Sequence, residues 1–160
     1  MGITVIGITH PGQVGALPDG TNVLVLADDG TYAEEFLEAD FRAHQLVVRA
    51  HGRGSAFFGV ADTAREWGAD RVLFGGFRRG APEAGEDPVL ALDPAGGIAF
   101  NSSFAGHLAE WVRPANAYGD GIVTWLVQNC VRTGIRVARG DVGWNPLRTD
   151  DVPSLRKLTA

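Results

Sequence analysis

The stretch "HGRGS" brings an imidazole, a guanidinium and a hydroxyl together within five residues, with glycines between them. An imidazole can move a proton near neutral pH, a guanidinium binds anions, and glycine lets backbone N–H groups approach a ligand closely. The apolar run before the stretch and the amphipathic segment after it predict a strand, a loop and then a helix N-terminus, which attracts anions. The candidate ligand-binding residues of this loop are Gly52, Arg53, Gly54 and Ser55, with Ser55 also the expected N-cap, and His51 is the candidate catalytic residue.

Polar residues also follow the other expected strands, and ligands of doubly wound sheets bind outside the carboxyl ends of the strands. "ADDG" closes one strand, "GGFRRG" follows another, and "RGD" follows the last. The structural alternatives are a turn with acids at a helix N-terminus for the aspartates and a solvated loop for the arginines. The further candidate ligand-binding residues are Asp28, Gly76, Arg78, Arg79 and Asp141.

Metal and thiol chemistry have less support. His107 and Glu110 stand three residues apart on an expected helix, but no third ligand is near them in the sequence, so we interpret them as a surface pair and predict no metal site. Cys130 is the single cysteine and falls on the apolar face of an expected helix, which indicates a core residue rather than a nucleophile. We predict no cofactor.

Alternating strand and helix patterns define the expected fold. Apolar, β-branched runs predict strands over residues 3–9, 22–28, 46–51 and 71–76, and helical periodicity predicts helices over 31–44, with Thr31 and Glu34 as a capping box, and over 55–69. Strands alternating with helices predict βαβ units and a parallel sheet. Beyond it, residues 89–93 and 97–103 are expected to be short strands around "PAGG", as a hairpin or as one interrupted edge strand, and helices over 104–112 and 119–134 precede a last strand. Five residues of the 119–134 helix are expected to face inward: Ile122, Trp125, Leu126, Cys130 and Val131.

Composition bounds the class of protein. The 160 residues, 45% of them hydrophobic, fit one α/β domain spanning residues 1–160, with a mostly parallel sheet, helices on both faces and a small hairpin, in a caspase-like or flavodoxin-like three-layer arrangement. A net charge of −5 argues against nucleic-acid and acidic-membrane partners. The single cysteine and the absence of a long apolar run favour a cytoplasmic protein.

Three segments resemble the caspase-like cysteine peptidases, over about half the chain. "LVVRAHG" resembles the strand that presents the catalytic histidine, "RVLFGGFRRG" resembles the next strand, which carries the catalytic cysteine, and "FNSSFAGHLAEW" with "YGDGIVTWLVQNC" resembles later elements. The resemblance implies His51 as the catalytic histidine, but the nucleophile position falls at Gly75 or Gly76. Because glycine cannot attack a carbonyl, peptidase activity is not expected.

Three functional hypotheses remain open at this point. The first is a caspase-like or related binding module without catalysis, which uses the pocket around His51 and Gly76 to hold a protein partner or a small anionic ligand. The second is a hydrolase or transferase that acts on an anionic small substrate, with His51 as general base. The third is a structural subunit of an assembly. Whether the chain is an enzyme, and its oligomeric state, stay undecided.

Overall fold

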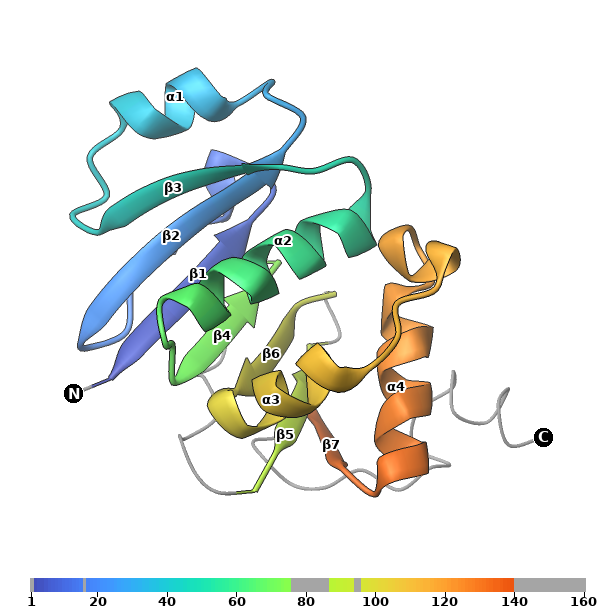
Figure 1. Cartoon of the computed structure of the whole chain (residues 1–160). Coiled ribbons are helices and arrows are strands. Elements are labelled where there is room, and N and C mark those ends of the chain that lie inside the picture. Colours follow the sequence, from blue (N-terminus) through green and yellow to red (C-terminus); the bar gives the residue numbers. More distant parts are fainter. Residues whose placement is uncertain (1, 16, 76–86, 94–95, 140–160) are drawn as a thin grey trace.

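The computed structural model describes residues 2–15, 17–75, 87–93 and 96–139, which form a seven-stranded sheet flanked by helices (Figure 1). The strand order is β3-β2-β1-β4-β6-β5-β7, and β6 alone among these strands runs against the others. The strands are β1 (Ile3–Ile8), β2 (Thr21–Asp28), β3 (His44–Arg49), β4 (Arg71–Phe74), β5 (Val89–Leu92), β6 (Ile98–Asn101) and β7 (Arg136–Arg139).

Helices lie on both faces of the sheet, and alternating residues of β2 show how each face is buried. Val23 and Val25 pack in the same cluster as the residues of α2, whereas Leu24 and Leu26 pack with Phe36 of α1 on the other face. In Figure 1, α2, α3 and α4 lie on the same side of the sheet. The helices are α1 (Ala33–Glu38), α2 (Arg53–Glu66), α3 (Ser102–Glu110) and α4 (Ile122–Thr133), with the short 3₁₀ turns η1 (Pro11–Gln13) and η2 (Ala115–Tyr118).

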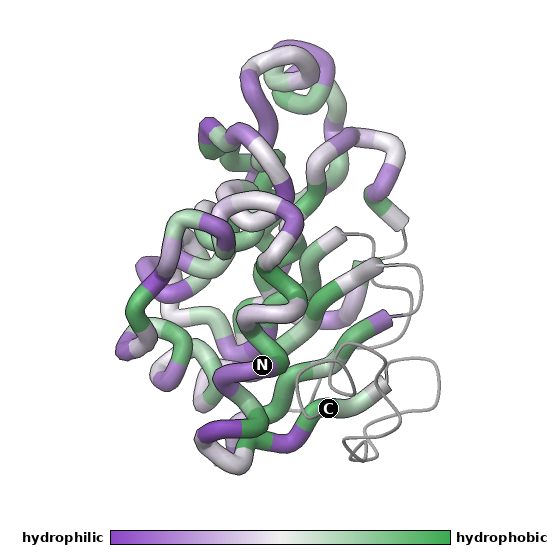
Figure 2. The backbone as a smooth tube through the Cα atoms, turned by 90° about the vertical axis from the view of Figure 1, so that its right-hand side faces the viewer, coloured by the Kyte–Doolittle hydropathy of each residue, from purple (hydrophilic) through white to green (hydrophobic). Residues whose placement is uncertain are grey.

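The predicted fold class is therefore confirmed, as a three-layer α/β arrangement with a β5–β6 hairpin. Parallel strands covered on both faces require near-continuous apolar runs, and β2 is buried over its last six residues. Figure 2 shows the strands as mostly hydrophobic segments, with the hydrophilic segments concentrated in the connections. Among the described residues, no helix has the length and apolarity needed to cross a bilayer.

Aromatic rings fill the core between the sheet and α2 to α4. Phe57 of α2 contacts the rings of Phe74 and Phe100 on the sheet, each at 5.7 Å between centroids. Farther out, the Trp111 and Trp125 rings meet edge to face at 6.0 Å, and Trp125 also contacts Phe58. Edge-to-face pairs add to the stabilisation that burial of the rings provides.

The helix after β2 is much shorter than the periodicity predicts. It spans Ala33–Glu38, and the side chains of Thr31 and Glu34 do not form the expected capping box. The hydroxyl of Thr31 instead donates a hydrogen bond to the Asp29 carboxylate. The Gln45 amide donates to the carbonyl oxygens of Phe36 and Ala39, both at 2.8 Å, and so ties the end of α1 to β3.

Two details of the later helices also differ from expectation. Ser55 does not cap α2, because the helix begins two residues earlier, at Arg53, after Gly52. In α4, Val131 is 43% exposed, whereas the other four residues expected to face inward are buried. The end of α4 follows the prediction: Gly134 adopts the left-handed conformation, with φ of 74°, that terminates many helices.

The strand order also bears on the caspase-like interpretation. That interpretation needs the strand ending at His51 to lie beside the strand leading to Gly76. In the structure β2 and β1 lie between β3 and β4, so the two strands are separated by three interstrand spacings, or roughly 14 Å. A histidine and a nucleophile cannot meet across that width through one hydrogen bond.

Candidate functional site

The carboxyl ends of β1 to β4 open into a cleft of about 850 Å³. The strand order reverses at β1, because β2 pairs with one edge of this strand and β4 pairs with the other. In doubly wound sheets, ligands bind at such a reversal. The volume of the cleft falls within the range typical of small-molecule sites. The lining residues come from five connections and strand ends, and they are Thr9, Gln13, Ala27, Asp28, Asp29, Thr31, Tyr32, Ala50, His51, Gly52, Arg53, Ala56, Phe74, Gly75 and Gly96.

One wall, which we call the β2 wall, consists of residues 28–32. Asp28 is 9% exposed, and its two carboxylate oxygens accept hydrogen bonds from the N–H groups of Gly30 (2.9 Å) and Tyr32 (2.7 Å). The exposed Asp29 accepts from the N–H and the hydroxyl of Thr31 through one oxygen, Oδ1. Asp28 therefore holds the loop together, whereas Asp29 is the exposed carboxylate of this wall.

The opposite wall, which we call the α2 wall, consists of residues 50–53. Gly52 has φ of 97°, a conformation that side chains rarely adopt, and it turns the chain from β3 into the first turn of α2. The N–H of His51 donates to Ser55 Oγ at 3.3 Å, and its imidazole is exposed. The Arg53 guanidinium donates to the carbonyl oxygen of Gly96 at 2.6 Å, so this wall is linked to the β5–β6 turn.

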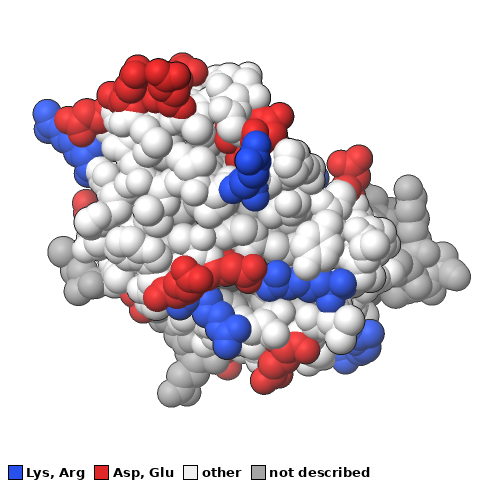
Figure 3. Space-filling view, turned by 45° about the horizontal axis from the view of Figure 1, so that its top comes forward, with Lys and Arg blue, Asp and Glu red and all other residues white. Residues whose placement is uncertain are grey.

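Opposite charges face each other across the cleft. The pKa of Asp29 lies below its ordinary value, chiefly because the Thr31 hydroxyl donates to the carboxylate, and the nearby His51 side chain acts in the same direction. On the other side the helix dipole and Arg53 favour an anion. Figure 3 shows acidic side chains gathered over α1 at the upper edge, where Glu34, Glu35 and Glu38 lie.

The structure brings four of the predicted site residues together in the cleft, namely His51, Gly52, Arg53 and Asp28. Gly54 and Ser55 do not line it: Gly54 is buried against residues 117–119, and its N–H donates to the Gly119 carbonyl oxygen at 3.1 Å instead of facing a ligand. The Ser55 hydroxyl oxygen accepts a hydrogen bond from the His51 N–H. The predicted residues Gly76, Arg78, Arg79 and Asp141 lie outside the described residues.

Sequence reasoning missed the contribution of β1 and α1. Thr9 and Gln13 line the cleft from the end of β1, where the Thr9 N–H donates to Gln13 Oε1 at 2.8 Å. Tyr32 lines it from the start of α1, and its ring meets His10 edge to face at 4.4 Å. These residues could have been predicted, because "THPGQ" follows the first expected strand and ligands bind outside the carboxyl ends of strands in doubly wound sheets.

The described residues contain no cluster of three or more His, Cys, Asp or Glu side chains that could hold a metal ion. Cys130 is fully buried in α4, away from the cleft, and burial raises the pKa of its thiol to about 12. The thiol therefore stays protonated at neutral pH and takes no part in the site.

The sequence matches no protein-family model and no curated protein. Three solved structures are similar to it. Rv0371c from Mycobacterium tuberculosis H37Rv is 19% identical, with 98% of this chain and 96% of that chain covered and a TM-score of 0.45. Its homolog from Mycobacterium sp. strain JC1 is 17% identical, with 86% and 85% covered and a TM-score of 0.45. A protein described as a nucleotide-diphospho-sugar transferase, from Desulfovibrio desulfuricans G20, is 12% identical, with 86% and 78% covered and a TM-score of 0.49.

The caspase-like resemblance is wrong. The separation of β3 from β4 overturns it, since a degenerate peptidase pocket between His51 and Gly76 requires neighbouring strands. The interpretation of the chain as a pseudoenzyme of that family fails with it.

Proposed function

We propose that the cleft binds a nucleotide and that the protein is a transferase acting on a nucleotide-linked substrate. The observation that carries this proposal is the pairing of two chemically different walls at the reversal of strand order. The Arg53 guanidinium suits a phosphate group, and the Asp29 carboxylate suits the hydroxyls of a ribose. Tyr32 offers an aromatic surface for a base.

His51 is the proposed general base. It is the imidazole among the described lining residues, it is exposed, and it lies close enough to Asp29 for their charges to interact. In the proposed step His51 takes the proton of an acceptor hydroxyl, and the acceptor oxygen forms the new bond to the transferred group. The nucleotide leaves with the electron pair of the broken bond. With water as the acceptor, the same step is a hydrolysis.

Ligand binding tests the proposal first. ADP, GDP, CDP and UDP are compared with inorganic pyrophosphate and the free nucleosides by isothermal titration calorimetry and by thermal unfolding. We expect at least one nucleoside diphosphate to bind and to raise Tm. At a concentration one hundred times its Kd, it should raise the free energy of unfolding by about 2.7 kcal/mol. Failure of every nucleotide to bind would overturn the proposal.

Matched variants then locate the ligand. Arg53→Gln and Asp29→Asn should each weaken nucleotide binding, while their controls, Arg65→Gln at the far end of α2 and Asp19→Asn in the β1–β2 connection, should not; both control positions are exposed. His51→Gln should leave nucleotide binding largely intact and abolish turnover, with His107→Gln on α3 as its control. If none of the three cleft variants changes nucleotide binding, the nucleotide binds outside the cleft.

A further inference from the structure

A stripe of residues along α2 contacts the connection between α3 and α4. Gly54, Phe58 and Asp62 follow one another at four-residue spacing, which places them on one face of the helix. Each of them touches residues 111–119, which we call the strap. The strap therefore runs lengthwise along α2, from the C-terminal half of the helix to the first turn beside the cleft.

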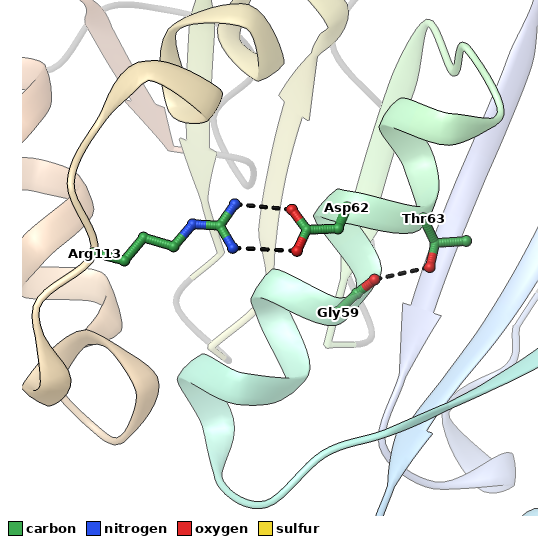
Figure 4. Close-up of polar contacts among 4 residues, drawn as sticks. All are labelled: Gly59, Asp62, Thr63 and Arg113. Carbon is green, nitrogen blue, oxygen red and sulfur yellow. Dashed lines mark hydrogen bonds and ion pairs between the residues drawn. The ribbon is translucent and has the colours of Figure 1, made fainter.

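The outer contact of the strap is a two-pronged ion pair (Figure 4). Arg113 Nη2 lies 2.8 Å from Asp62 Oδ1, and Arg113 Nη1 lies 3.2 Å from Asp62 Oδ2. The same guanidinium lies over the ring of Phe58, with Cζ 4.2 Å from the ring centroid, and Tyr118 packs on that ring at 4.9 Å. Hydrogen bonding to Asp62 is the main cause that raises the pKa of Arg113. The planar guanidinium is needed for both contacts at once.

The inner contact of the strap is made by backbone atoms. A Cβ added at Gly54 would lie 1.8 Å from the Ala117 carbonyl oxygen, so the helix and the strap touch without a side chain between them. The Gly54 N–H donates to the Gly119 carbonyl oxygen at 3.1 Å. One residue earlier in the chain, Arg53 lines the cleft. A Cβ added at Gly52 would lie 3.3 Å from the Tyr118 carbonyl oxygen, so the end of the strap also contacts the α2 wall itself.

We propose that Arg113 is a positioning residue for the cleft: through Asp62 and Phe58 it fixes the strap along α2, and the strap fixes the residues 51–53 that face the ligand. This inference rests on the proposed function only in naming the ligand as a nucleotide. Arg113 itself does not line the cleft, and its action is exerted through Gly54.

A purely stabilising role would have a different signature. The side chain of Asp62 is 56% exposed and that of Arg113 is 22% exposed, and ion pairs at such exposure contribute little to the free energy of unfolding. Loss of the pair should therefore leave the protein folded. The strap would then be free to shift along α2, and the effect would be seen at the α2 wall.

The first readout is the NMR signals of the histidine rings without ligand. The chain has four histidines, so the signals are assigned by single substitutions. In Arg113→Lys and in Asp62→Asn we expect the His51 ring signals to move, while those of His10, on the β1 side of the cleft, stay in place. Arg65→Lys is the control, because Arg65 is exposed on the same helix and takes no part in the strap contacts described above.

The second readout is affinity for the nucleoside diphosphate that binds best. We expect Kd to rise about two- to thirtyfold in Arg113→Lys and in Asp62→Asn, with Arg65→Lys unchanged. If His51 moves but the parent protein binds no nucleotide, the positioning role stands and the proposed function fails. If both variants fold and neither the His51 signals nor Kd changes, the positioning role is overturned. Should Arg113→Lys not fold, Asp62→Asn decides alone.

Discussion

The two walls of the cleft are built in different ways. The side-chain hydrogen bonds of the β2 wall join residues at most four positions apart, from Asp28 to Tyr32, and one main-chain bond links it to the α2 wall, from the Ala50 N–H to the Asp28 carbonyl oxygen at 2.8 Å. The α2 wall depends on distant segments: Arg53 bonds to Gly96, and Gly52 and the adjoining Gly54 contact residues 117–119. A wall closed by local bonds can keep its shape when the rest of the domain changes. A wall held from outside takes its position from its supports.

The largest expected effect breaks the α2 wall at its support. Gly54→Ala puts a methyl group where the Ala117 carbonyl oxygen lies, so helix and strap must separate. We expect the free energy of unfolding to fall by about 3 kcal/mol, at the upper end of overpacking costs. Urea unfolding followed by circular dichroism measures it.

The control for that change is Gly106→Ala, in the middle of α3. A Cβ at Gly106 would meet nothing within 4 Å, and alanine is the better helix former. We expect stabilisation by about 0.5–1 kcal/mol. Equal and small effects of the two substitutions would contradict the contact between helix and strap.

The next effect belongs to the β2 wall. Asp28→Ala removes both acceptors of the Gly30 and Tyr32 N–H groups, at a cost of about 2 kcal/mol. Because these bonds are local, hydrogen exchange should accelerate in residues 29–36 and not in α2. Asp29→Ala, at an exposed position, is the comparison. Faster exchange throughout α2 would show that the two walls are not independent.

A smaller effect, in the core around α4, depends on pH. The thiol of Cys130 has its pKa raised by burial to about 12, from an ordinary value of 9.0. Between these values the unfolded chain loses the proton first, so stability is intact below pH 9 and declines as the pH rises toward 12. The expected loss is about 1.4 kcal/mol at pH 10, measured as the difference between the parent protein and Cys130→Ala. The same loss in Cys130→Ala would assign it to other groups.

The smallest effects on stability come from the residues that face the ligand. Asp29→Asn and His51→Gln change exposed side chains, and we expect each to alter the free energy of unfolding by less than about 0.5 kcal/mol. Their effect should appear in binding and turnover instead. Destabilisation well above that range would mean that these side chains support the walls rather than the ligand.

The difference between the walls also explains what could be predicted from the sequence. The strands, the position of α2 and the Gly134 stop follow from local periodicity and glycine conformation. Asp28 was found by its place at a strand end. The role of Gly54 could not be predicted, because "HGRGS" shows a glycine in a loop and gives no sign of residues 117–119 of the strap, more than sixty residues later in the chain.

The order of the strands in the sheet was the second feature that the sequence did not predict. Apolar runs identify the strands but carry little information on which are neighbours, so the caspase-like interpretation placed the ends of β3 and β4 side by side. The insertion of β1 and β2 between them depends on the long crossover through α2. Thr9 and Gln13, in contrast, were predictable in principle, because they follow the end of β1 as the other site residues follow their strands.

The edge-to-face contact of Trp111 with Trp125 has an optical consequence. Two indole rings at 6.0 Å couple their electronic transitions, and the pair joins the first residue of the strap to α4. The near-ultraviolet circular dichroism of the protein should therefore carry a signal from this pair, one that is sensitive to the angle between the rings. Displacement of the strap could then be followed in the native protein without any attached label.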